Sequence, residues 1–90
     1  MPYIKKIQRD IYEDQISQIA ISLLGAPDRQ AYGELNYIIS SLIHRIVTPK
    51  NISYTRFNGI IGALECAKQE FYRRMVAGYE DKKRVENGDI

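Results

Sequence analysis

The chain of 90 residues has no tryptophan, one cysteine, one histidine and a net charge of only +2. Cys66 alone can form neither an internal disulfide nor a zinc site, which fits a reducing compartment. The near balance of 13 basic and 11 acidic residues gives a weak field for nonspecific binding of nucleic acid. We therefore expect a cytoplasmic protein and disfavour nucleic acid as its partner.

Long apolar runs are also missing. The longest falls far short of the roughly 20 residues that a membrane-spanning helix needs. The opening residues 1–6 lack the apolar core and the cleavage site of a signal peptide. The sequence thus predicts no membrane association and a single helical domain over residues 1–90. A chain this short has a thin stability margin, for which oligomerisation is a common remedy, so a homo-oligomer is expected.

An internal repeat is the most informative feature that is present. Residues 32–42 read Tyr-Gly-Glu-Leu-Asn-Tyr-Ile-Ile-Ser-Ser-Leu, and residues 54–64 read Tyr-Thr-Arg-Phe-Asn-Gly-Ile-Ile-Gly-Ala-Leu. Tyr, Asn, Ile, Ile and Leu are identical at matching positions. The repeat predicts two helices of like design, each with an apolar stripe and one Asn beside it, that face each other.

Apolar periodicity and breakers predict three helices and no strand. Gly25 and Pro27 end the first helix, and Pro49 stops the second. Ser53 is a good N-cap that fixes the start of the third at Tyr54. The expected helices cover about residues 7–24, 30–47, and 54 to 75 or beyond 78.

A link of about six residues between the second and third helices favours an antiparallel hairpin, with the first helix packed across it. The predicted fold class is all-α, a three-helix unit that oligomerises. The polar stretch 79–90 is either a helical extension or a C-terminal arm lying on a neighbour. Gly59 and Gly62 lie opposite the large apolar stripe of the third helix. They leave room for close approach by the first helix or by another subunit.

Several polar residues could form a ligand site beside the apolar stripes. Asn36 and Asn58 flank their stripes equivalently, and their amides can set helix register or read a nucleobase edge. In the hairpin Asn36 would lie near Glu65, and Asn58 near His44. Tyr37 and His44 share the outer face of the second helix, as a ligand site or subunit surface would require.

The densest cluster of functional groups is Glu70 with Tyr72, Arg73 and Arg74. Glu70 can pair with both arginines along the helix as a solvated ion pair. Alternatively the arginines hold an anion while the phenol ring stacks on a base, because a guanidinium fork fits phosphate oxygens. The candidate ligand-binding residues are therefore Asn36, Tyr37, His44, Asn58, Glu65, Tyr72, Arg73 and Arg74.

Catalytic and metal motifs are absent. Cys66 has no partner base, and Glu65 and Glu70 lie on different faces of the helix. His44 has no carboxylate or cysteine at helical spacing. We predict that the protein is not an enzyme and carries no metal or cofactor.

The motifs Gly-Glu-Leu-Asn-Tyr-Ile (33–38), Glu-Cys-Ala-Lys (65–68), Glu-Phe-Tyr-Arg-Arg (70–74), Tyr-Glu-Asp-Lys-Lys (79–83) and Glu-Asn-Gly-Asp (86–89) carry a resemblance. The chain resembles, nearly end to end, a family of short uncharacterised proteins found in bacteria, archaea and phages. That family has no established general activity. The phage connection implies, by analogy, a small helical oligomer that binds and sequesters nucleotide immune messengers.

The sequence leaves two main hypotheses of function. The first is a non-enzymatic homo-oligomer that acts as a sponge for a small anionic ligand, such as a nucleotide messenger. The second is a protein-interaction module of the anti-defence inhibitor type, which presents a helical face to a partner. A third, nucleic-acid binding through basic residues at both ends, is disfavoured by the near-neutral charge.

Overall fold

The computed structural model describes residues 4–90, and all regular secondary structure in that range is helical. The predicted all-α class is therefore confirmed. The chain divides into two compact units, one reaching to Ile52 and the other covering Ser53–Ile90. No helix among the described residues is long and apolar enough to cross a membrane. The elements are α1 (Lys6–Arg9), α2 (Glu13–Leu24), α3 (Asp28–Ile46), α4 (Tyr54–Phe71), the π-helical segment η1 (Tyr72–Val76) and α5 (Ala77–Asn87).

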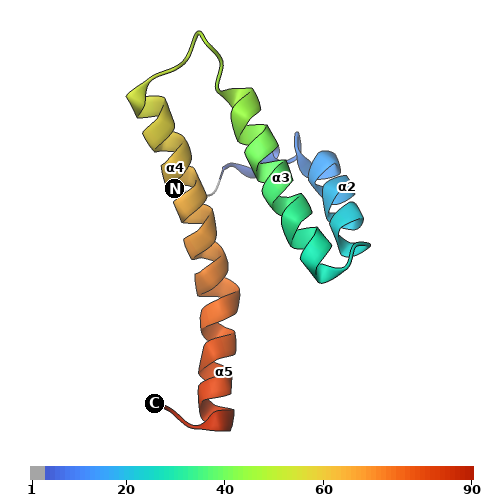
Figure 1. Cartoon of the computed structure of the whole chain (residues 1–90), viewed down its shortest axis with the longest axis vertical. Helices are drawn as coiled ribbons and strands as arrows, with labels where there is room; N and C mark the ends of the chain where they lie inside the picture. The colour runs from blue at the N-terminus through green and yellow to red at the C-terminus, as the bar shows by residue number, and fades with distance from the viewer. Residues whose placement is uncertain (1–3) are drawn as a thin grey trace. The chain divides into compact units, whose positions relative to one another are not determined.

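In the first unit, α2 and α3 run antiparallel and contact each other across a short turn (Figure 1). The turn begins at Gly25, whose backbone N–H donates to the Ile21 carbonyl. Pro27 precedes α3 with extended backbone, φ −59° and ψ 151°. Proline suits this place because it fixes φ and the first helical turn does not need its N–H. The predicted end of the first helix is thus confirmed.

The first predicted helix is interrupted, which corrects the expectation of one continuous helix over residues 7–24. A short helix ends at Arg9, and α2 begins only at Glu13. Between them the Tyr12 N–H donates to the Arg9 carbonyl at 3.0 Å. This bond joins residues three apart, which tightens the chain and ends the α-helical ladder. Tyr12 is the N-cap of α2, and its carbonyl accepts from the Ile16 N–H at 3.0 Å.

The Asn51 side chain holds the link after α3 through two hydrogen bonds to backbone groups. The Asn51 amide oxygen accepts from the Thr48 N–H at 2.7 Å, and its amide nitrogen donates to the Ile46 carbonyl at 3.2 Å. One of the orphan carbonyls at the end of α3 is thereby satisfied.

The second unit is a single run of helix from Tyr54 to Asn87 (Figure 1). It begins as predicted, because the Ser53 hydroxyl accepts from the Arg56 N–H at 3.0 Å. The helix continues past Gly78 and ends at Gly88, whose φ of 89° favours glycine. Residues 79–87 are therefore a helical extension, and contact of this segment with a neighbour stays a prediction.

Neither unit has an interior. No residue among 4–90 is buried, and the most covered apolar side chains, such as Leu23 and Ile38 in the first unit and Ile60 in the second, are only half-buried. Since helices of this length draw most of their stability from packing an apolar face, these stripes need further cover. The hairpin and the oligomer stay predictions.

We expect Ser53→Ala to lower the free energy of unfolding by about 1 kcal/mol, because the helix from Tyr54 loses the acceptor for one of its first N–H groups. Urea denaturation followed by circular dichroism measures this loss. Ser53→Asp is the matched control, since its carboxylate keeps the acceptor. Equal losses in both variants would contradict a capping role for Ser53.

Candidate functional site

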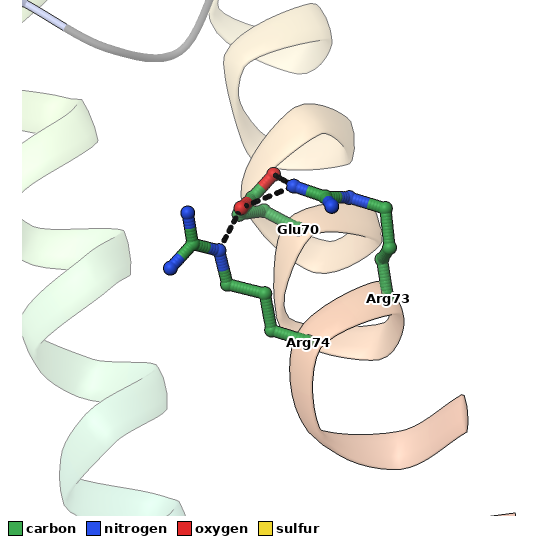
Figure 2. Close-up of polar contacts among 3 residues, drawn as sticks. All are labelled: Glu70, Arg73 and Arg74. Atoms are coloured by element: carbon green, nitrogen blue, oxygen red, sulfur yellow. Dashed lines mark hydrogen bonds and ion pairs between the residues drawn. The ribbon is translucent and has the colours of Figure 1, made fainter. Parts of the chain in front are cut away.

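Two guanidinium groups converge on one carboxylate where α4 passes into η1. The Nη2 atom of Arg73 donates to both Glu70 carboxylate oxygens, at 2.8 Å to Oε1 and 3.0 Å to Oε2. Arg74 donates from Nε to the same Oε1 atom. Figure 2 shows the carboxylate of Glu70 lying between the two arginine side chains. The predicted ion pairs of Glu70 are thus confirmed.

This geometry follows from helical spacing, because residues three and four positions apart are neighbours on the helix surface. The Glu70 side chain is 24% exposed, whereas those of Arg73 and Arg74 are 67% and 60% exposed. Exposed ion pairs of this kind contribute about 0–1 kcal/mol each, so they are a weak source of stability. Both guanidinium groups therefore face solvent while meeting at one anionic group.

An open hollow of about 590 Å³ lies beside this cluster on the same helix. Within its lining the Gln69 amide donates to Glu65 Oε1 at 3.1 Å, and Lys68 Nζ lies 3.8 Å from the same oxygen. The hollow thus mixes two cations with two carboxylates and is not a purely basic pocket. Its polar lining residues are Glu65, Lys68, Gln69, Glu70, Tyr72 and Arg73.

Tyr72 reaches across the π-helical segment to a residue that the sequence analysis missed. Its hydroxyl donates to Glu80 Oε2 at 3.0 Å. In a regular α-helix, residues eight apart point about 80° away from each other. The π-helical segment takes one more residue per hydrogen-bonded turn, which brings positions 72 and 80 onto one face. No periodic pattern in the sequence signals this pairing.

The hydrogen bond to Glu80 raises the pKa of Tyr72 above its ordinary value. The negative charges of Glu80 and, more weakly, Asp81 act in the same direction, because each disfavours a phenolate. Tyr72 therefore stays a neutral hydrogen-bond donor to higher pH than an ordinary tyrosine.

The structure brings together only part of the predicted site. Tyr72, Arg73 and Glu65 line one hollow in the second unit. Asn36, Tyr37 and His44 lie on α3 in the first unit, where the Asn36 amide oxygen accepts from the Ser40 hydroxyl at 3.3 Å. Asn58 is exposed on α4. Proximity of Asn36 to Glu65, or of Asn58 to His44, would join the two units and stays a prediction.

The chemistry that this cluster offers is anion binding. Within residues 4–90 no group of three or more His, Cys, Asp or Glu residues is arranged to hold a metal ion. The Cys66 thiol is exposed. Guanidinium forks, by contrast, match the oxygens of carboxylates and phosphates.

These features define a small all-α protein with an arginine–glutamate cluster at a π-helical segment. The chain belongs to the family DUF6899, a domain of unknown function, whose model matches residues 1–90. This match confirms the resemblance to an uncharacterised family. No curated protein and no solved structure matches the chain.

We expect Tyr72 to ionise at a higher pH than it does in a Glu80→Gln variant, which removes the carboxylate. Because the pKa is raised in the folded protein, the contact stabilises the fold fully below the ordinary tyrosine pKa. This contribution is lost as pH rises through the raised pKa. Tyrosinate absorbance during an alkaline titration measures the effect. Tyr72→Phe should remove the late-ionising group, whereas Tyr79→Phe should not; an identical titration in the Glu80→Gln variant would contradict the assignment.

Proposed function

We propose that this protein is a non-enzymatic helical binding protein that assembles from identical copies and sequesters a small anionic ligand, such as a nucleotide immune messenger. The observation that carries the proposal is the convergence of Arg73 and Arg74 on the single carboxylate of Glu70. Two guanidinium groups that can meet at one carboxylate can also meet at one phosphate, because both anions present oxygens to the same fork.

The residues beside the cluster suit a nucleotide. The Tyr72 ring lies next to the arginines in sequence and lines the same hollow as Arg73, where it could stack on a base. Asn36 and Asn58 carry amides that can read a base edge if the assembly brings them near. The exposed flanks of the guanidinium groups leave a phosphate room to approach.

Glu70 sets how such a ligand would bind. Its carboxylate already occupies part of both arginine forks, so a phosphate would bind beside Glu70 or displace it. The anion would then bind on the solvent side of the two guanidinium groups, above the half-covered carboxylate.

A matching nucleotide should raise the midpoint of thermal unfolding. At a hundredfold excess over Kd the stabilisation is about 2.7 kcal/mol, which in a chain of this size is roughly 10 °C or more. A panel of linear and cyclic nucleotides at constant protein concentration tests this. Replacing Arg73 and Arg74 together by Lys keeps the charge but removes the forks, and should abolish the shift.

Arg45→Lys, on α3, is the matched control and should keep the full shift. Circular dichroism must show that the double variant is folded. A panel without any shift for the native protein would overturn the ligand proposal, as would an undiminished shift in the folded double variant.

A second candidate function, a protein-interaction module, is favoured by the exposure of large aromatic and apolar side chains. Tyr37 is 69% exposed on α3, and His44 lies in the last turn of the same helix. Aromatic residues of this kind are enriched at protein interfaces. In this case Tyr37, His44 and the helical extension beyond Gly78 would contact the partner.

This second candidate predicts that Tyr37→Ala combined with His44→Ala weakens capture of a specific partner protein at least about tenfold, the loss typical of one interface anchor. Nucleotides should leave that affinity unchanged. Pull-down with the native chain, followed by titration of the identified partner, measures it. Capture that survives both this double variant and truncation after Gly78 would reject the assigned surface.

A further inference from the structure

The carboxylate of Glu70 lies at the point where an anion would contact both arginines. It accepts from Arg73 Nη2 through both of its oxygens, at 2.8 Å and 3.0 Å, and from Arg74 Nε through Oε1. Figure 2 shows it between the two guanidinium groups. Since the side chain is 24% exposed and has several rotatable bonds, its carboxylate can turn toward solvent without a change in the backbone.

A bound anion and the Glu70 carboxylate would compete for the same guanidinium groups. An anion that contacts both arginines would lie only a few ångströms from that carboxylate, and like charges at such a distance repel. Glu70 is also attached to the site by its own side chain, so it returns at high effective concentration whenever the ligand leaves. A ligand therefore has to bind the arginines better than a tethered carboxylate does.

The strength of the two ion pairs limits this competition. Each exposed pair shifts an equilibrium by up to about fivefold, so a ligand that breaks both loses up to about thirtyfold in affinity. A phosphodiester carries one negative charge, as the carboxylate does, and gains little from the exchange. A phosphate monoester carries a charge of about −1.5 to −2 at pH 7 and three acceptor oxygens, so it exceeds the carboxylate in both respects.

The charges of the cluster and the hollow match a doubly charged group once Glu70 has moved. With Glu70 in place, Lys68, Arg73 and Arg74 stand against the carboxylates of Glu65 and Glu70, three cations against two anions and a net charge of +1. With Glu70 turned to solvent, the same three cations face only Glu65, which gives a net charge of +2. A phosphate monoester would neutralise this charge, whereas a phosphodiester would leave half of it.

We propose that Glu70 is a built-in competing anion, and that the site therefore selects a ligand with a terminal phosphate monoester over a phosphodiester. This inference rests on the proposed function, because it requires that Arg73 and Arg74 bind a nucleotide. It deepens that function by naming the class of phosphate and the residue that excludes weaker anions. All of the groups that it uses lie on one helix within the second unit.

Isothermal titration calorimetry with adenosine 5′-monophosphate and its methyl ester compares the two classes on one nucleoside. The native chain should bind the monophosphate at least about tenfold more tightly than the ester, because the ester lacks one negative charge close to both guanidinium groups. Glu70→Gln keeps the shape of the side chain and should tighten binding of the monophosphate by about threefold to thirtyfold.

Glu65→Gln is the matched control. It removes a carboxylate that lines the same hollow and pairs with Lys68, and it leaves the contacts of the arginines with Glu70 in place. It should therefore tighten binding clearly less than Glu70→Gln does. Equal affinity of the native chain for the monophosphate and the ester would overturn the assigned phosphate class. A folded Glu70→Gln variant that binds no more tightly than Glu65→Gln would overturn the competition.

Displacement can also be observed directly by nuclear magnetic resonance. Saturation with the monophosphate should shift the carboxylate ¹³Cδ resonance of Glu70, which exchanges its arginine contacts for water, more than that of Glu34 on α3. An unchanged Glu70 resonance at saturation would overturn the displacement.

The results also separate this inference from the proposed function. Stabilisation of the native chain by a phosphodiester messenger alone would overturn this inference and leave the proposed function standing. The same holds if the monophosphate binds through Arg73 and Arg74 but Glu70→Gln has no effect. If no nucleotide binds either the native chain or the Glu70→Gln variant, both proposals fall.

Discussion

The structure of this protein depends on one constraint, that its apolar side chains must be buried in contacts which each unit alone does not provide. The helices α2, α3 and α4 carry isoleucine, leucine and aromatic side chains, yet no residue among 4–90 is buried. Conformational entropy opposes folding by about 1–2 kcal/mol for every ordered residue, and surface ion pairs cannot offset that cost. The packing of α2 on α3 supplies part of the missing contact. The rest has to come from surfaces outside each unit, either in the same chain or in another copy.

The π-helical segment between α4 and α5 determines which residues share a face of the long helix. Segments of this type are rare and often mark functional sites, because they replace regular helical bonding with a wider turn. Here the wider turn brings Tyr72 and Glu80, which are eight residues apart, onto one face of the helix. One result is the contact between Tyr72 and Glu80.

Local sequence signals predicted where helices begin and end. They did not predict the break before Glu13 or the π-helical segment. Ser53 predicted the start of the long helix because a cap acts through its immediate neighbours, and Gly25 and Pro27 predicted the end of α2 for the same reason. The break before Glu13 depends on a bond from Tyr12 to Arg9 that apolar periodicity does not reveal. Within the candidate site, helical spacing predicted the ion pairs of Glu70 with Arg73 and Arg74. It did not predict the hydrogen bond between Tyr72 and Glu80, because the rule that residues three and four apart are neighbours fails across a π-helical segment. A meeting of Asn36 with the arginines would join the two units and stays a prediction.

The charged cluster and the exposed side chains of Phe71, Met75 and Tyr79 occupy the same short stretch of helix. Any anion that orders Arg73 and Arg74 therefore also orders the backbone that presents Met75. If assembly fixes this stretch, the ligand meets a site whose ordering cost is already met, and binds more tightly to the assembled form. Linkage then requires the reverse, that the ligand strengthens assembly by the same factor. If the chain assembles as proposed, it would therefore respond to its ligand through its own oligomeric state.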